Sequence, residues 1–170
     1  MNYLPMKKLI IAILTLQVVS SCGIYSFSGT SIAPDVNSIT VDYIQNKAMR
    51  VNPALSNNFT EALKDKYRRL TKLKLDAENG DLFIEGEIVA YETTSLAVTA
   101  QEVASQNRLT ITIKIRYTNN KYPKENFEKT FAEFEDYPST STLDQVEARL
   151  TDAIIEKLVE AVFNATVANW

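Results

Sequence analysis

The residue with the best-defined chemistry in this chain is Cys22, the single cysteine among 170 residues. Its thiol follows an apolar stretch from Leu9 to Val19 and the two small side chains of Ser20-Ser21. Lys7-Lys8 places positive charge before the apolar stretch. This order of charge, apolar core and small residues is typical of a secretory signal peptide, and the core is too short to span a bilayer.

The run Val19-Ser20-Ser21-Cys22 looks like a lipobox, the signal at which bacterial lipoprotein precursors are cut before a cysteine that is then acylated, for example with palmitate. We therefore expect cleavage between Ser21 and Cys22, with either Met1 or Met6 as the start of the precursor. Residues 1–21 are predicted to be a lipoprotein signal peptide. Residues 22–37, a polar lead, are predicted to tether the lipidated Cys22 to a single domain over residues 38–170.

A second group of candidate residues lies on the clearest predicted strand, residues 108–118. Leu109, Ile111, Ile113, Ile115 and Tyr117 alternate with polar residues, so one face of this strand is expected to be buried and the other wet. Arg108, Lys114 and Arg116 fall on the polar face. They could form an ordinary solvated face, or they could contact a partner or the phosphates of an anionic lipid, which an Arg guanidinium can hold with two hydrogen bonds.

The residue types of this chain give little support for a catalytic site or a metal-binding site. The chain has no histidine, which excludes Ser-His and Cys-His catalysis and imidazole metal sites. Glu85 and Glu87 could act as a carboxylate pair, but the alternation around Gly86 favours a solvated face. Glu133–Asp136 could bind Ca²⁺ but lacks the spacing of a known loop. We expect no enzyme, no metal and no cofactor. Without residues 1–21 the chain keeps 16 basic against 21 acidic residues, and this net charge of about −5 disfavours bulk nucleic-acid binding.

The elements that must position these residues can be read from periodicity. Residues 38–44 alternate as a strand, and residues 53–70 carry apolar side chains at helical spacing. Asn79-Gly80 predicts a turn between the alternating segments 73–76 and 82–91. A fourth strand is predicted over residues 127–135, with a bulge because Phe134 breaks the parity of Phe127 and Phe131.

The last predicted element is a helix over residues 143–167. Its apolar stripe is widened by Ile155, Val159 and Phe163 beyond what one sheet face requires. The order β-α-β-β-β-α predicts an α+β fold, a two-layer α/β sandwich. In it, two helices pack on one face of a four-stranded, mostly antiparallel sheet.

The whole pattern resembles the LptE family, in the version found in the Bacteroidota. The segments that carry the resemblance are Cys22–Gly29, Ser38–Tyr43, Phe59–Lys66, Asn107–Ile111 and the terminal Trp170. The resemblance implies an outer-membrane lipoprotein that faces the periplasm. It implies a plug inside the β-barrel LptD that helps deliver lipopolysaccharide to the outer leaflet, without an enzymatic step.

The partners expected from this resemblance are an LptD-like barrel, lipopolysaccharide and the membrane that holds the lipid anchor, with no nucleic acid. Family members contact the glycolipid through basic residues, but none matches here residue by residue. Arg108, Lys114 and Arg116 are therefore candidates from strand geometry alone.

Two other functions stay open at this point. An envelope lipoprotein could act as an adaptor for another assembly or secretion complex, with Ile155, Val159 and Phe163 as its docking stripe. A hydrolase with an unfamiliar carboxylate site at Glu85 is the remaining alternative.

Overall fold

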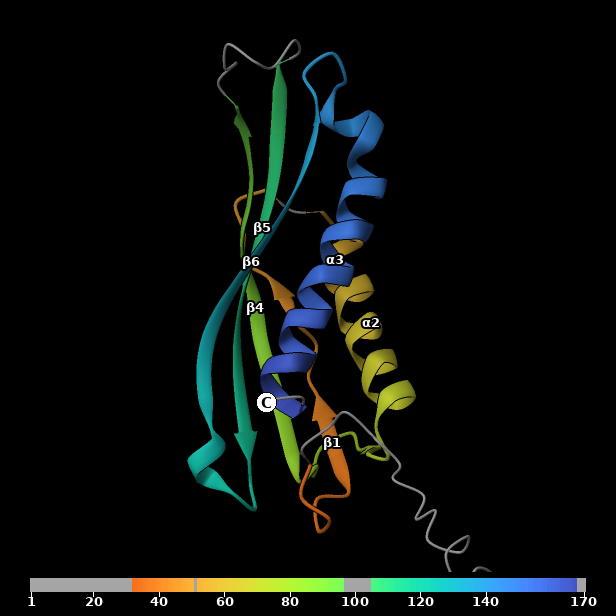
Figure 1. Ribbon diagram of the computed structural model, residues 1–170, viewed down its shortest axis with the longest axis vertical. Coiled ribbons are helices and arrows are strands. Elements are labelled where there is room, and N and C mark those ends of the chain that lie inside the picture. Colours follow the sequence, from red (N-terminus) through yellow and green to blue (C-terminus); the bar gives the residue numbers. More distant parts are fainter. Residues whose placement is uncertain (1–31, 51, 97–104, 168–170) are drawn as a thin grey trace, which may run out of the picture.

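The computed structural model describes residues 32–50, 52–96 and 105–167, which form a sheet layer and a helix layer. Figure 1 shows the two helices side by side on one face of the sheet. The elements in chain order are β1 (Ser38–Val41), β2 (Gln45–Asn46), α2 (Leu55–Leu70), β3 (Lys74–Leu75), β4 (Leu82–Ser95), β5 (Gln106–Asn119), the 3₁₀ turn η1 (Pro123–Glu125), β6 (Phe127–Pro138) and α3 (Leu143–Val167). The α+β fold and the placement of both helices on one face are confirmed.

The sheet contains six strands and is mixed, so the prediction of four mostly antiparallel strands is wrong. The strand order is β3-β1-β4-β5-β6, and β2 also pairs with β4. β1 runs parallel to β3 and to β4, and β2 runs parallel to β4, whereas β4, β5 and β6 are antiparallel neighbours. The physical reason is the α2 crossover, which returns the chain to the end of the sheet where β1 begins. β2 has two residues, too few for alternation to reveal it. β3 lies within the alternating segment 73–76, but its pairing with β1 was not predicted.

The Asn79-Gly80 turn does not join two neighbouring strands. β1 lies between β3 and β4, and Gly80 has no positive φ. A Cβ at Gly80 would lie 2.4 Å from the backbone N of Thr40, so glycine is needed there because the backbone of β1 passes so close. Loop 76–81 instead carries the chain past β1.

The bulge predicted in the fourth strand lies in a different strand. β6 pairs with β5 in continuous register, from Gln106 opposite Pro138 to Tyr117 opposite Phe127. The irregularity lies in β4, between Ile88 and Ala90. Phe134 breaks the apolar parity because it lies on the open face of the sheet, where 41% of its surface is exposed.

The core lies between the helices and the inner face of the long strands. Leu109, Ile111, Ile113 and Ile115 of β5 are fully buried, as their alternation predicted, and α3 has the predicted bounds. Burying each such side chain contributes about 1.5–3 kcal/mol. The inner face of β5 is therefore committed to packing, and only its outer face is available for contacts.

The residues that widen the apolar stripe of α3 pack this helix against α2. Ile155, Val159 and Phe163 are each less than a tenth exposed. The ring of Phe163 lies 5.2 Å from that of Tyr67 on α2. The Tyr67 hydroxyl shares a hydrogen bond with the Thr166 hydroxyl, and burial raises the pKa of Tyr67 far above its usual value. The stripe proposed as an adaptor dock is thus covered by this chain's own α2.

Candidate functional site

The predicted lipidation and cleavage residues, Cys22 and Ser21, lie outside the described residues. The site that the structure does place is the open face of the sheet, opposite the two helices. We call it the sheet face and define its cations as Arg108, Lys114 and Arg116. It is built from β4, β5 and β6.

Lys114 and Arg116 belong to one network of ion pairs across three strands. The Arg116 guanidinium donates to Glu85 Oε1 of β4 at 2.8 Å and to Glu128 Oε2 of β6 at 2.9 Å. Lys114 Nζ lies 2.6 Å from Glu128 Oε1. The hydrogen bond from Lys114, with that from Arg116, holds the pKa of the Glu128 carboxyl below its usual range. Each of these two cations thus already has a carboxylate partner.

A shallow hollow of about 330 Å³ lies over this network. Its lining carries both signs of charge. The lining residues are Asp42, Tyr43, Gln45, Lys47, Glu85, Gly86, Glu87, Lys114, Arg116 and Glu128. With four carboxylates against three cations in the lining, an anionic ligand that binds Lys114 or Arg116 would have to displace or share an existing carboxylate partner.

Arg108 is separated from the other two cations. It lies six positions before Lys114 on β5, a separation of about 20 Å at the rise of a strand. Its guanidinium donates two hydrogen bonds to Asp136 of β6, at 2.8 and 2.9 Å, and stacks 3.5 Å above the ring centroid of Phe134. The hydrogen bond from Arg108 lowers the pKa of the Asp136 carboxyl. The structure therefore brings Lys114 and Arg116 together and leaves Arg108 in a second, separate pair.

Three of the five carboxylates considered for catalysis or calcium binding form ion pairs. Glu85 pairs with Arg116, Asp136 with Arg108, and Glu135 with Lys157 of α3 at 2.7 Å. Within residues 32–50, 52–96 and 105–167, no three His, Cys, Asp or Glu side chains are grouped as a metal ion would require. Sequence reasoning missed these pairings, because opposite charges on neighbouring strands become visible only once the register is known.

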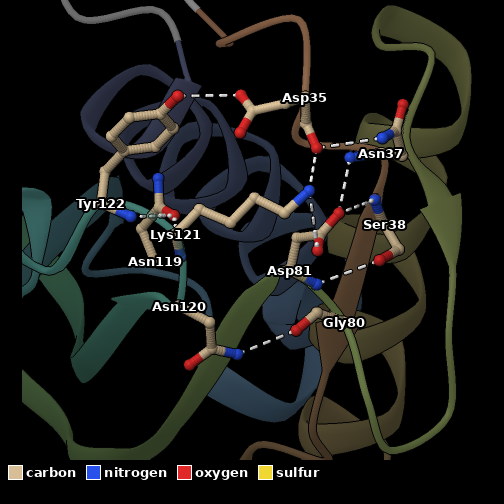
Figure 2. Close-up of polar contacts among 9 residues, drawn as sticks. All are labelled: Asp35, Asn37, Ser38, Gly80, Asp81, Asn119, Asn120, Lys121 and Tyr122. Carbon is tan, nitrogen blue, oxygen red and sulfur yellow. Dashed lines mark hydrogen bonds and ion pairs between the residues drawn. The ribbon is translucent and has the colours of Figure 1, made fainter.

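A second polar cluster, which the sequence did not indicate, joins the entering chain to the end of the sheet (Figure 2). Asp81 accepts hydrogen bonds from the backbone N–H groups of Asn37 at 2.7 Å and Ser38 at 3.3 Å. The first of these bonds lowers the pKa of Asp81 the most, and Lys121 pairs with the same carboxylate. Lys121 also donates to the backbone carbonyl of Asp35.

This cluster fixes the direction in which the chain enters the domain. Tyr122 Oη donates to Asp35 Oδ1 at 2.9 Å, and Asn120 donates to the carbonyl of Gly80 at 3.0 Å. Val36, inside the predicted tether, is buried in the core. Residues 32–37, which precede β1, thus lie at the base of the molecule, the end where β1 begins and where α2 and α3 end (Figure 1).

No helix in the described part of the chain has the length and apolar character needed to cross a membrane.

Comparisons with known proteins identify a family and a fold. A family model described as "LptE: Lipopolysaccharide-assembly" matches residues 36–166. No curated protein sequence matches this chain. A solved homolog of the neuraminyllactose-binding hemagglutinin from Helicobacter pylori is 9% identical with a TM-score of 0.52, over 81% of this chain and 87% of that one.

A minor lipoprotein from Acinetobacter baumannii is 14% identical, with a TM-score of 0.47, over 74% of this chain and 88% of that one. At this TM-score the Acinetobacter structure carries no argument. The Helicobacter structure shows a shared fold and nothing about function.

Proposed function

We propose a role for this chain in lipopolysaccharide assembly, on the premise that it belongs to the LptE family. The observation that carries the proposal is the family match over residues 36–166, which runs from the buried Val36 to the last turn of α3. In this proposal the chain is a non-enzymatic outer-membrane lipoprotein that faces the periplasm. It works in and beside an LptD-like β-barrel that delivers lipopolysaccharide to the outer leaflet.

Membrane attachment in this proposal comes from Cys22, after cleavage between Ser21 and Cys22. Acyl chains anchor strongly, at about 0.8 kcal/mol for each CH₂ that enters the bilayer. The test is membrane fractionation of the natural chain and of Cys22→Ser. We expect the natural chain in the outer-membrane fraction with an acylated amino terminus by mass spectrometry, and Cys22→Ser in the soluble periplasmic fraction.

The two faces of the sheet support the barrel partnership. The helices cover the inner face, so a partner can meet the sheet face without disturbing the core. Its charges are already arranged in pairs, which gives a polar surface suited to a lumen lined with polar side chains. Arg108, Lys114 and Arg116 remain the proposed contacts with the barrel or the glycolipid.

The decisive experiment is copurification from detergent with the natural chain as bait, together with depletion of the protein. Recovery of a large β-barrel, and loss of surface lipopolysaccharide on depletion, are the expected results. Intact surface lipopolysaccharide with no barrel recovered would reject the proposal. Recovery of a different envelope complex would favour the adaptor function, although its proposed dock on α3 is buried.

The contribution of the sheet face is tested with Lys114→Gln combined with Arg116→Gln. Glutamine removes the charge without placing a new carboxylate beside Glu85 and Glu128, as Glu would. We expect weaker recovery of the barrel with an unchanged circular dichroism spectrum. Equal recovery would show that the sheet face is only a solvated surface.

A further inference from the structure

Four basic residues lie within seven positions at the end of α2: Arg68, Arg69, Lys72 and Lys74. Arg68 pairs with Asp65 one turn earlier. Arg69, Lys72 and Lys74 are exposed, and none of them forms an ion pair with a residue in the described ranges. We call these three the corner cations. Their charge is available to a ligand, because no carboxylate of the described fold neutralises it.

Two of the corner cations, Arg69 and Lys72, border an apolar cleft of about 450 Å³ at the base, and Lys74 follows the last lining residue, Leu73, in the chain. The lining residues are Ile32, Ala33, Pro34, Val36, Asn37, Arg69, Leu70, Thr71, Lys72 and Leu73. Arg69 and Lys72 are the charged members of this lining, and both are positive. Leu70 is half exposed, at 50%, beside them. Positive charge next to exposed apolar surface matches an amphipathic ligand whose charged group is an anion.

Two acidic residues near the corner cations, Asp76 and Asp35, already accept hydrogen bonds from other groups. Asp76 accepts hydrogen bonds from the backbone N–H groups of Glu78 and Asn79, at 2.9 and 2.8 Å. Asp35 accepts from Tyr122 on the other side of the base. Glu78 is exposed and is the remaining nearby carboxylate of the loop that follows β3. The positive field of the corner is therefore weakened but not cancelled.

The short distance along the chain between the cleft and Cys22 indicates that the ligand is a lipid of the membrane in which Cys22 is anchored. Ile32, which lines the cleft, is separated from Cys22 by residues 23–31, nine residues. A fully extended stretch of that length spans about 30 Å. A lipid on Cys22 would thus hold the corner within reach of the headgroups of its own leaflet.

We propose that the corner cations and the adjoining cleft bind the phosphate headgroups of anionic phospholipids in the leaflet that carries the Cys22 anchor. This inference rests on the anchoring part of the proposed function. The guanidinium of Arg69 and the ammonium groups of Lys72 and Lys74 donate to phosphate oxygens. Leu70 and Ile32 contact the glycerol and upper acyl region. The contact orients the domain, base toward the bilayer, before any barrel is engaged.

The test uses the full lipidated chain in vesicles of phosphatidylcholine alone, or of phosphatidylcholine with phosphatidylglycerol. With Cys22 acylated as proposed, Leu70→Cys supplies a unique thiol for a polarity-sensitive fluorophore. The matched control is Met49→Cys, at a fully exposed position before the opposite end of α2. Flotation with the vesicles reports the anchor, and the emission maximum at position 70 reports the headgroup contact.

We expect a blue shift at position 70 with phosphatidylglycerol, and none at position 49. The shift should be absent in neutral vesicles, in Arg69→Gln/Lys72→Gln/Lys74→Gln, and at 1 M salt, where the Debye length falls to about 3 Å. Flotation with an unchanged emission at position 70 would overturn the headgroup contact and leave the anchor intact. Failure to float would overturn the anchor and this inference with it. A shift produced by lipopolysaccharide but not by phosphatidylglycerol would also overturn it.

Discussion

The sheet face and the corner at the end of α2 each carry a group of basic residues, but the two groups differ in whether carboxylates pair with them. Lys114 and Arg116 share Glu85 and Glu128, and Arg108 holds Asp136 with two hydrogen bonds. The corner cations have no such partner among the described residues. The regularly spaced cations of β5 therefore join neighbouring strands of the sheet through ion pairs. The less regularly spaced corner cations remain available to bind a ligand.

The largest expected change in stability is at Gly86, where β4 and β5 lie in close contact beside the ion pairs of the sheet face. A Cβ at Gly86 would lie 2.4 Å from the carbonyl oxygen of Lys114, so β4 and β5 would have to separate. We expect Gly86→Ala to lower the free energy of unfolding by about 1–3 kcal/mol in urea denaturation. Ala132→Val, which enlarges an exposed side chain on the open face of the sheet, should change it by less than about 0.5 kcal/mol.

A paired and a free cation should differ in their contribution to stability. Arg108→Ala removes a two-point contact with a carboxylate that is about a third exposed, and we expect a measurable fall in the melting temperature. Lys72→Ala removes a cation without a partner in the described fold and should stay within about 0.5 kcal/mol. Equal losses in thermal denaturation would mean that the two regions do not differ as the contacts indicate.

Lowering the pH should weaken the Arg108–Asp136 ion pair on the sheet face. It should not change the contribution of the corner cations to stability. The folded-state pKa of Asp136 lies below its ordinary value of 3.8, because Arg108 donates to the carboxylate. The stabilisation is therefore present above that value and is lost as pH falls through the lower folded-state pKa. Melting temperatures from pH 7 to pH 2.5 should show a shallower acid decline for Asp136→Asn than for the natural chain. Arg69→Gln should follow the natural profile.

The smallest expected effect is at Lys114, whose pair with Glu128 is more than a third exposed on both sides. Lys114→Gln should cost about 0.5 kcal/mol at low salt, the usual range for an exposed pair. At 1 M salt the difference from the natural chain should disappear, since exposed charges are then screened. A salt-independent loss would point to packing by the lysine stem instead of charge.

Regular periodicity was sufficient for the long elements. The alternation from Arg108 to Thr118 predicted both the strand and its buried face, and the apolar stripe of the last helix predicted its bounds. The same signals failed for β2, whose two residues cannot display a period. They indicated the segment around β3 but not its partner, so the parallel pairing of β1 was missed. Phe134 misled the prediction because an aromatic ring on a wet face, covered by Arg108, reads as a core residue.

For the candidate site, too, the sequence predicted one part and only the tertiary structure decided the rest. Residue order alone placed Arg108, Lys114 and Arg116 on one polar strand face, and the concentration of basic residues from Arg68 to Lys74 is visible in the chain itself. Only tertiary structure decided which of these cations are neutralised. The partners of Arg116 lie 31 and 12 positions away, on strands whose register is set by buried side chains of the opposite face. Local sequence determines which face a charge lies on, but packing of distant segments determines whether it meets a carboxylate or remains free.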